Sequence, residues 1–377
     1  MLPGYAGPLF VISFRSVKRG KLLLSRKTAF QRALRTWYRQ HHRRLPWRVK
    51  PSLYRTVVSE FMLQQTQVKT ALPYFERWMI ALPDFAALAA TPESRVLKLW
   101  EGLGYYSRAR NLRRLAQTLA TLPALPTTPE GWRDLPGVGP YTAAAVTSLA
   151  FAARAACVDG NVVRVLARLT ADHTVFRDSA TAARHFTPLA DALLPHADPG
   201  THNQAMMELG ALVCRRHDPA CAICPVRRFC AAARRNAPED YPRLARKKTG
   251  RRAVTRAWCE DDARLLLHRA ASGARRLADL HELPTPGDLG LDDAAVRAGP
   301  LLARKTRGFT NHRITESIHV LRLSAGQRHR LKANAALRWV PWAELDLITL
   351  SGPHRRWVEE ILTQTAQDKK AAWHFQA

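Results

Sequence analysis

The pattern of apolar and polar positions divides the chain into two regions. From Ala29 to about Phe229, apolar residues recur every three or four positions, and Pro and Gly interrupt the pattern at intervals. This spacing places apolar side chains on one face of successive helices, so we predict a helical domain over 29–232. After residue 253 the segments are short and alternate between apolar and polar positions, as in Ile314 to Leu323. Such alternation is typical of half-buried strands and predicts a smaller α+β domain over 254–367.

Three further segments lie outside these domains. Residues 233–253 are rich in Arg and Lys and contain two prolines, which predicts a basic linker. Residues 368–377 are expected to form a tail. Residues 1–28 are basic and contain no Asp or Glu. This N-terminal extension fits a DNA-contacting arm, a transit-like peptide or the product of an upstream start codon.

The charge of the chain indicates the kind of partner it binds. Among 377 residues, 59 are Lys or Arg and 30 are Asp or Glu, which gives a formal net charge of +29. Lys and Arg that neutralise phosphates release counterions, so this excess predicts a nucleic-acid partner. A GC-rich genome also favours Arg, but it would have added acidic residues as well. No apolar run reaches the roughly 18 residues that a bilayer requires, so we expect no membrane partner.

Four of the six cysteines form a compact motif, Cys214-x6-Cys221-x2-Cys224-x5-Cys230. Thiolates gathered in one short loop can converge on a single metal centre. A four-cysteine zinc site is the alternative, although such sites usually use two close pairs and only one is present here. Cys157 and Cys259 fall outside the motif and are expected in the core.

A glycine-containing turn and an aspartate suggest a phosphate contact and a polar site. Gly137 and Gly139 precede an Ala-rich stretch, which predicts a turn followed by a helix over 135–150. Glycines let backbone amides approach a ligand, and a following helix N-terminus favours an anion. A plain connector explains the same residues. Asp159 precedes the next helical stretch, where on its own it is expected to act as an N-cap.

Glu60 lies within an apolar helical stripe, three positions from Val57 and four from Gln64. An apolar surrounding disfavours the ionised carboxylate, which raises its pKa and suits it to donate a proton near neutral pH. The alternative is an ordinary ion pair with a nearby residue such as Arg55. From the helix alone, the ion pair is the preferred interpretation.

Several motifs together resemble the MutY-type adenine DNA glycosylases of the endonuclease III, or helix–hairpin–helix, superfamily. The matching stretches are Leu45 to Arg48, Ser59 to Val68, Trp100 to Asn111, the hairpin with Asp159, Asn203 to Gly210, and the cysteine spacing. The resemblance covers about residues 29–230. It implies a helix–hairpin–helix glycosylase fold with a [4Fe-4S] cluster on Cys214, Cys221, Cys224 and Cys230. It also implies base excision repair of double-stranded DNA in which adenine is mispaired with 8-oxoguanine or guanine.

The resemblance further implies roles for single residues. Glu60 is expected to protonate the leaving adenine at N7, and Asp159 to stabilise the cationic sugar, with Tyr141 and Asn161 assisting them. Relatives that cut the DNA strand carry a Lys nucleophile where this chain has Tyr141, so we expect an essentially monofunctional enzyme. The expected DNA- and base-binding residues are Arg48, Leu63, Gln65, Thr66, Tyr105, Gly137, Gly139 and Gln204. Core packing is the alternative for Leu63 and Tyr105.

Residues 254–367 resemble, less closely, the MutT-like domain of this family. Phe309, Thr310 and Asn311 occupy its lesion-reading loop, where relatives carry Phe, then Ser or Thr, then His. Thr310 keeps a hydroxyl for the altered base, whereas Asn311 departs from the pattern and leaves the strength of 8-oxoguanine recognition open. An ordinary strand and turn is the alternative. We find no acidic cluster suited to Mg²⁺, so nucleotide hydrolysis is not expected.

Two other functions compete with adenine excision. One is an endonuclease III-like glycosylase and lyase acting on oxidised pyrimidines, against which Glu60 and Tyr141 argue. The other is a non-catalytic DNA-binding protein that uses the cluster as a redox or structural element. Within the adenine glycosylase hypothesis we expect a monomer in the bacterial cytoplasm, associated with the nucleoid, with downstream repair proteins as candidate partners.

Overall fold

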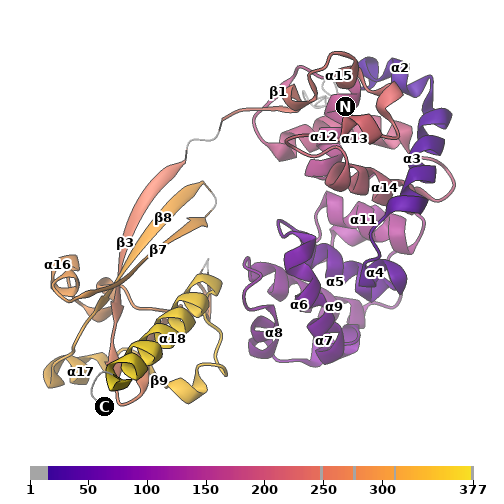
Figure 1. Cartoon of the computed structure of the whole chain (residues 1–377). Coiled ribbons are helices and arrows are strands. Elements are labelled where there is room, and N and C mark those ends of the chain that lie inside the picture. The colour runs from indigo at the N-terminus through magenta and orange to yellow at the C-terminus, as the bar shows by residue number, and fades with distance from the viewer. Residues whose placement is uncertain (1–15, 247–248, 275–276, 310, 375–377) are drawn as a thin grey trace, which may run out of the picture. The chain divides into compact units, whose positions relative to one another are not determined.

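A computed structural model describes residues 16–246, 249–274, 277–309 and 311–374. The chain folds into two compact units (Figure 1). The first comprises Met1–Ala90 and Asn111–Arg246, and the second comprises Thr91–Arg110 and Lys247–Ala377. In the described part of the chain, no helix is both long and apolar enough to cross a membrane.

The first unit is built mainly of helices, which agrees with the helical fold predicted from periodicity. Its helices are α2 (Lys21–Leu24), α3 (Lys27–His41), α4 (Pro46–Val49), α5 (Leu53–Leu63), α6 (Val68–Ala81), α7 (Phe85–Ala90), α10 (Pro129–Arg133), α11 (Pro140–Ala150), α12 (Gly160–Thr170), α13 (Ser179–Leu193), α14 (Pro199–Leu212) and α15 (Ala231–Arg234). The 3-10 turns are Cys221–Ile223, Arg227–Phe229 and Pro238–Asp240. Strands β1 (Val175–Phe176) and β2 (Arg243–Leu244) pair in parallel. Helix α9 (Ser107–Thr121) begins in the second unit and continues into the first.

Polar residues at the helix starts explain several of these boundaries. Ser52 caps α5 by accepting a hydrogen bond from the Arg55 amide at 3.2 Å. Pro140 opens α11, where its missing N–H leaves no helical hydrogen bond unmade. Asp159 caps α12 by accepting from the Val162 amide at 2.8 Å, so the N-cap expectation is confirmed.

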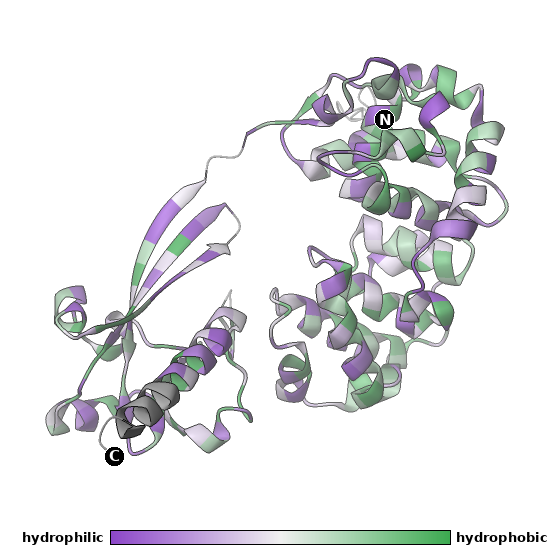
Figure 2. Ribbon diagram, viewed as in Figure 1, coloured by the Kyte–Doolittle hydropathy of each residue, from purple (hydrophilic) through white to green (hydrophobic). Residues whose placement is uncertain are grey.

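Helices α3, α12, α13 and α14 share the main hydrophobic core of the first unit. Phe30, Leu166, Phe186 and Leu209 are all completely buried in it. Most helices carry hydrophilic and hydrophobic residues side by side, as Figure 2 shows. Burial of the apolar faces supplies the main stabilisation of such an arrangement, at about 25 cal/mol for each Å² removed from water.

The helical packing begins before residue 29. Leu23 of α2 is buried in the core. Arg19 forms an ion pair with the buried carboxylate of Asp172, which also contacts His185 Nε2 at 2.8 Å. Residues 16–28 of the N-terminal extension therefore pack as part of the first unit. Residues 1–15 lie outside the described residues.

The second unit combines strands with helices. Its elements are α8 (Glu93–Trp100), β3 (Gly250–Trp258), β4 (Glu260–Asp261), β5 (Arg264–Arg269), β6 (His281–Glu282), α16 (Asp293–Arg297), β7 (Leu301–Phe309), β8 (His312–Val320), α17 (Ala325–Leu331), β9 (Leu337–Pro341) and α18 (Gly352–His374), with 3-10 turns at Gly287–Leu289 and Trp342–Glu344. Strand β8 covers most of the segment whose alternation predicted a strand. It lies between β3, with which it is parallel, and β7, with which it is antiparallel.

A second sheet is centred on β5, which pairs antiparallel with β4, β6 and β9. Leu265 of β5, Val340 of β9 and Ile318 of β8 are completely buried, together with Val358 of α18. One face of α18 therefore closes the core of this unit.

The second unit also buries a group of charges as ion pairs. The guanidinium of Arg256 donates to Glu316 at 2.7 Å and to Glu282 at 3.0 Å. Arg307 also pairs with Glu316, at 2.5 Å. Burial alone would raise the pKa of Glu316, but its hydrogen bond with His354 and the charge of Arg256 outweigh it and lower the pKa to about 2. The carboxylates are thus neutralised by arginines within the sheet.

Candidate functional site

A cleft of about 1090 Å³ opens in the first unit, lined by residues from α4, α5, α11, α12 and α14. It brings together many of the predicted site residues. Those that line it are Glu60, Asp159, Tyr141, Asn161, Arg48, Leu63, Gln65, Thr66, Gly137, Gly139 and Gln204. Residues 60 and 159, which the proposed chemistry requires in one place, therefore face the same cavity.

Glu60 lies on the buried face of α5, and only 8% of it is exposed. Burial raises its pKa from the ordinary value of 4.5 to about 7, and the charge of Asp159 raises it while Tyr141 and Arg48 lower it. Arg55, the alternative ion-pair partner, instead donates to the Pro46 carbonyl at 3.3 Å. Glu60 can therefore hold or release a proton near neutral pH.

Tyr141 lies in the first turn of α11, beside Glu60. Its hydroxyl forms a hydrogen bond with the Glu60 carboxyl and lies 3.1 Å from the sulfur of Met207. Burial and the charges of Glu60 and Asp159 raise the pKa of Tyr141 well above its usual value. The side chain is therefore a neutral phenol, which donates to the carboxylate but cannot serve as an amine nucleophile.

Both carboxylate oxygens of Asp159 are held in place. Oδ1 caps α12, and Oδ2 accepts a hydrogen bond from Asn161 Nδ2 at 2.8 Å. Burial raises the pKa of Asp159, whereas the hydrogen bonds from Val162 and Asn161 lower it. The cap and the expected catalytic role are therefore compatible, because capping fixes the orientation of the carboxylate that faces the cleft.

Contacts within α12 and with α14 fix the side chain of Asn161. Arg164 donates to Asn161 Oδ1 at 2.8 Å, to the Gly210 carbonyl at 2.8 Å and to the Cys214 carbonyl at 2.7 Å. A Cβ atom on Gly210 would lie 2.6 Å from Asn161 Cβ, so only glycine permits this approach of α14 to α12. The start of α12 is thus supported directly by α14.

Glu208 lines the cleft but was not predicted from the sequence as a site residue, although it lies within the Asn203 to Gly210 motif. It is 1% exposed, and its carboxylate accepts hydrogen bonds from Arg43 at 2.8 Å and from Arg48 at 3.0 Å. Burial alone would raise its pKa, but these hydrogen bonds outweigh it and lower the pKa to about 2. Glu208 therefore fixes Arg48 at the cleft. The signal in the sequence was its position four residues after Gln204, on the same helical face.

Gln204 and Arg48 share a partner in Tyr38 of α3. The Tyr38 hydroxyl hydrogen-bonds to the Gln204 side-chain oxygen, and the Arg48 guanidinium lies 5.8 Å from the centre of the Tyr38 ring. Burial raises the pKa of Tyr38, so the phenol stays protonated and donates. This wall of the cleft offers an amide and a cation in fixed positions.

The two glycines of the hairpin before α11 differ in backbone conformation and in the space around them. Gly137 has a φ of +74°, and a Cβ atom there would lie 2.5 Å from Asn111 Cβ. Gly139 has a φ of −92°, and a Cβ atom there would meet open space. Gly137 is therefore required by the fold of the hairpin, and Gly139 leaves room next to the N-terminus of α11, where an anion is favoured.

The residues at the end of α5 form the rim of the cleft. Leu63 is half-buried, Gln65 is exposed with a φ of +57°, and Thr66 is half-buried. Tyr105 belongs to the second unit, has a φ of +48° and is 47% exposed. Core packing is therefore the wrong explanation for Tyr105, which presents its ring to solvent.

The four predicted cysteine ligands lie between α14 and the start of α15, and none forms a disulfide. Burial raises the pKa of Cys221, Cys224 and Cys230, and neighbouring cysteines raise each pKa further. Over residues 16–246, 249–274, 277–309 and 311–374, no three His, Cys, Asp or Glu side chains are arranged to hold a metal ion. Four thiols on one loop have the donor chemistry of an iron–sulfur site, but here they do not converge on a common centre.

A buried arginine holds the two ends of this cysteine loop. Arg168, 1% exposed, donates to the Arg215 carbonyl at 2.6 Å and lies 3.3 Å from Cys214 Sγ. Its own carbonyl accepts from Cys230 Sγ at 3.3 Å. The loop is thus anchored on α12, the helix that Asp159 caps.

The predicted lesion-reading residues lie between β7 and β8. Phe309 ends β7, and Asn311 is exposed immediately before β8. The Asn311 carbonyl accepts a hydrogen bond from the Gly250 amide at 2.8 Å, which joins the turn to the start of β3. Thr310 and the side chain of Phe309 lie outside the described residues.

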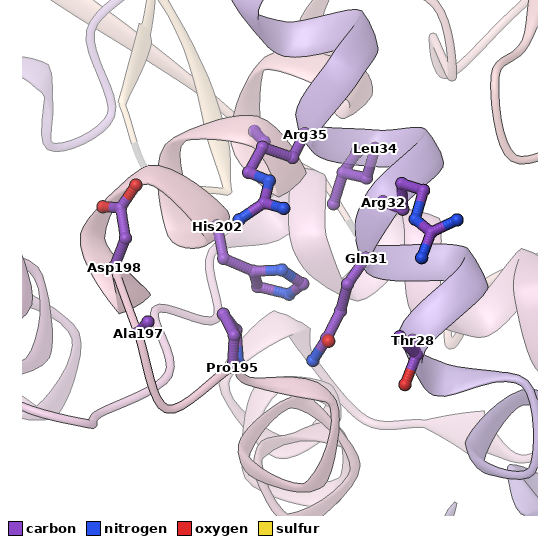
Figure 3. A pocket seen from close by; sticks show the side chains of 10 residues that line it. Thr28, Gln31, Arg32, Leu34, Arg35, Pro195, Ala197, Asp198 and His202 are labelled. Carbon is purple, nitrogen blue, oxygen red and sulfur yellow. The ribbon is translucent and has the colours of Figure 1, made fainter.

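A smaller cavity of about 130 Å³ lies between α3 and the start of α14 (Figure 3). The ring of His202 points into it, with Arg35 and Gln31 nearby. Burial lowers the pKa of His202 to about 4, so this side chain is neutral at physiological pH. None of the predicted site residues lines this cavity, and the larger cleft is therefore the candidate site.

The chain is similar to known DNA repair proteins. Residues 58–186 match the model of the HhH-GPD superfamily of base excision DNA repair proteins. An adenine DNA glycosylase of Rattus norvegicus is 44% identical over 222 residues, which cover 55% of this chain and 42% of that protein. The adenine DNA glycosylase of Buchnera aphidicola subsp. Acyrthosiphon pisum is 35% identical over 226 residues, which cover 59% of this chain and 64% of that protein. The chain thus spans less than two thirds of the length of these relatives.

A solved structure extends the similarity to the fold. The structure of a thermostable thymine-DNA glycosylase aligns with a TM-score of 0.50 and 27% identity, over 56% of this chain and 98% of that chain. The aligned share of this chain is close to the share that matches the adenine DNA glycosylases. The fold of this part of the chain is therefore similar to that of a thymine-DNA glycosylase.

Proposed function

We propose that this chain, whose residues 58–186 belong to the HhH-GPD superfamily of base excision DNA repair proteins, is a DNA N-glycosylase that excises adenine. Its similarity to the rat and Buchnera adenine DNA glycosylases supports the choice of base. The similarity to a thymine-DNA glycosylase concerns the fold, so the choice between bases depends on the residues in the cleft.

One observation carries the proposal: Glu60, with a pKa of about 7, and Asp159 line the same cleft. Hydrolysis of a purine N-glycosidic bond needs an acid for the leaving base and an anion for the sugar. Burial raises the pKa of both carboxyl groups. At Asp159, hydrogen bonds from Val162 and Asn161 counteract burial and favour the ionised form, which suits Glu60 to the first role and Asp159 to the second.

The first step uses the acid. Adenine inside a duplex is stacked and paired, so it must first be extruded into the cleft. Glu60 then donates its proton to N7 of the base. The bond between the sugar C1′ and N9 breaks with its electron pair going to adenine, which leaves as a neutral molecule. Arg48 and Gln204, fixed by Glu208 and Tyr38, are placed to contact the extruded base.

The second step uses the anion. Bond breakage leaves a positive charge shared by C1′ and the ring oxygen of the sugar. The carboxylate of Asp159, oriented by Asn161, stabilises this charge. Water then adds to C1′, and its proton passes to the Glu60 carboxylate, which restores the acid. The products are free adenine and an abasic site.

We infer that the enzyme does not efficiently cut the DNA strand. Strand cleavage by this superfamily's lyases starts from an amine that forms a Schiff base with the sugar. Tyr141 offers a neutral phenol beside Glu60 instead. The chain is therefore proposed to stop after base release.

The partner is proposed to be double-stranded DNA with adenine opposite 8-oxoguanine or guanine. Gly137 and Gly139 at the start of α11 suit a phosphate of the backbone. Residues 254–367, which combine strands and helices within the second unit, are proposed to be the MutT-like lesion-recognition domain, with residues 309–311 as the lesion-reading loop. Asn311, where relatives carry His, is expected to weaken the preference for 8-oxoguanine over guanine.

We also propose that Cys214, Cys221, Cys224 and Cys230 hold a [4Fe-4S] cluster. The donor set of four thiols on one loop supports iron, and the buried Arg168 beside Cys214 offsets the negative charge of thiolates. When bound, such a cluster would cross-link the loop after α14 and take no part in proton transfer. The check is the iron and sulfide content of the purified protein, with zinc as the competing result.

The activity is tested with three duplexes containing adenine opposite 8-oxoguanine, adenine opposite guanine, and thymine glycol. Base release is measured by separation of free adenine, and strand cleavage is measured with and without hot alkali. We expect adenine release from the first two duplexes and strand breaks only after alkali. Release from thymine glycol alone would establish the oxidised-pyrimidine activity instead. Binding without release from any duplex would indicate a non-catalytic DNA-binding protein.

A further inference from the structure

The loop between α8 and α9 in the second unit holds Tyr105 in an unusual backbone conformation. Gly102, Gly104 and Tyr105 have φ values of +102°, +71° and +48°. A left-handed conformation is unfavourable for an aromatic residue, so the surrounding contacts must impose it. The loop therefore holds the ring of Tyr105 in an exposed position.

Contacts inside the loop account for part of this conformation. Trp100 Nε1 donates to the Gly104 carbonyl at 3.1 Å, and Arg108 donates to the Leu103 and Gly104 carbonyls at 3.0 Å. The Arg108 guanidinium also lies 5.6 Å from the centre of the Tyr105 ring. These contacts fix the tip of the loop but connect it only to its own helices.

Glu101 connects the loop to the C-terminal part of the same unit. Its Oε1 accepts hydrogen bonds from the Leu350 amide at 2.7 Å and from Arg355 Nε at 3.1 Å. Its Oε2 accepts from Lys98 Nζ at 2.6 Å, and the same ammonium donates to the Ile348 carbonyl at 3.0 Å. The Glu101 side chain is 10% exposed. One buried carboxylate thus joins the start of the loop to residues 348–355.

A second set of contacts closes the other side of the loop. The Tyr106 hydroxyl donates to the Leu350 carbonyl at 3.1 Å, so Leu350 is held through both its amide and its carbonyl. A Cβ atom on Gly352 would lie 3.4 Å from Gly102 Cα, which shows how closely the two backbones approach. Residues on both sides of Tyr105 are therefore fastened to one backbone segment.

That segment is anchored in the sheet of the second unit. The His281 amide donates to the Thr349 carbonyl at 3.0 Å, and the Ser351 amide donates to the His281 carbonyl at 2.9 Å. Ser351 Oγ also donates to Glu282 at 2.8 Å. The Glu101 contacts therefore extend from the Tyr105 loop to strand β6.

We propose that Glu101 is a positioning residue through which the C-terminal residues 348–355 hold the Tyr105 loop in its DNA-binding conformation. The proposal rests on the function proposed above and on Tyr105 as one of the DNA-binding residues that the family resemblance implies, with its exposed ring stacked within the duplex beside the mispair. Glu101 touches neither the base nor the sugar. It acts by fixing the direction of the ring, so its loss weakens recognition of the mispaired duplex and leaves the chemistry at Glu60 and Asp159 unchanged.

The test substitutes Glu101→Ala in the full-length protein, with Asp346→Ala as the matched control. Asp346 also contacts Arg355, at 3.3 Å, but its side chain is 93% exposed. We expect Glu101→Ala to weaken binding to an adenine:8-oxoguanine duplex by roughly tenfold. The single-turnover rate at saturating enzyme should stay within about twofold of the wild-type rate. Asp346→Ala should match the wild type in both measurements.

A double-mutant cycle with Tyr105→Ala separates positioning from general loss of structure. If Glu101 acts through Tyr105, then Glu101→Ala adds nothing to the binding defect of Tyr105→Ala. Additive defects, or a Glu101→Ala protein that binds like the wild type, would overturn the proposal. Glu101→Gln keeps an acceptor for the Leu350 amide and is expected to restore part of the binding. A wild-type protein that releases no adenine would instead refute the proposed function itself.

Discussion

Asn161 Nδ2 donates a hydrogen bond of 2.8 Å to Asp159 Oδ2, the oxygen that the helix cap leaves unused. The two residues lie in the first turn of the same helix, so the amide and the carboxylate are fixed relative to one another. Arg164 completes the arrangement by donating to the Asn161 oxygen at 2.8 Å, which forces the amide nitrogen toward Asp159.

Removal of this amide should slow the chemical step. In Asn161→Ala, Asp159 keeps its cap but loses the donor that favours its ionised form and its orientation. We expect the single-turnover rate of adenine release to fall by about tenfold to a hundredfold, with duplex affinity little changed. Thr170→Ala at the other end of α12 serves as the control and should react at the wild-type rate. Equal rates for both variants would show that Asn161 does not orient the carboxylate.

The rate should depend on pH through Glu60. Because the pKa of Glu60 is raised to about 7, its acidic form predominates below pH 7 and is lost above it. The single-turnover rate of the wild type should therefore fall about tenfold for each pH unit well above 7. Glu60→Gln, which has no proton to donate, should lose nearly all activity at every pH. A wild-type profile that stays flat from pH 6 to pH 9 would contradict the assignment of Glu60 as the acid.

The same raised pKa should be visible in the stability of the protein. Glu60 binds its proton more tightly in the folded state than in the unfolded state, where its pKa is near 4.5. Its contribution is therefore fully present below about pH 4.5 and is lost as pH rises to about 7. This amounts to about 3 kcal/mol. Glu60→Gln should accordingly be more stable than the wild type at pH 8, by up to that amount, as measured by urea unfolding.

The stability advantage of Glu60→Gln should shrink as the pH is lowered toward 5. A pair of unfolding curves at pH 8 and pH 5 is enough to detect this trend. An advantage that is equal at both values would mean that the carboxyl is not held in its protonated form by burial.

The two hairpin glycines should respond differently to the same change. Gly137→Ala introduces a Cβ atom 2.5 Å from Asn111 at a φ of +74°, so we expect a loss of at least about 1–2 kcal/mol of stability. Gly139→Ala meets open space at an ordinary φ and should leave the free energy of unfolding nearly unchanged. Urea unfolding measures both. Similar losses for the two variants would contradict the backbone geometry of the hairpin.

The parts of the site that depend on local order could be predicted from the sequence. The helical stripe placed Glu60 on the buried face of α5, and the residue before the next helix placed Asp159 at its N-cap. Both signals act over a few residues, which is the range in which periodicity and capping operate. The family motifs then supplied the expectation that both residues share one cleft.

Contacts between distant segments could not be predicted in the same way. The ion pairs of Glu208 with Arg43 and Arg48 join positions 160 or more residues apart, and nothing in the sequence near Glu208 specifies them. The contacts of Glu101 with Leu350 and Arg355 span still greater separations. The spacing of the four cysteines suggested that their thiols converge on one metal centre, but the described side chains are not arranged to hold a metal ion. Their arrangement depends on how Arg168 and the loop backbone pack.

The glycine at position 210 has a consequence for redesign of base specificity. Its missing side chain lets the helix that presents Gln204 rest directly on Asn161. The wall proposed to contact the base and the turn proposed to stabilise the sugar are therefore in direct contact. An engineer who wishes to accept another nucleobase can exchange the side chain at 204, but any added bulk at 210 would displace the helix and disturb bond cleavage for every substrate alike.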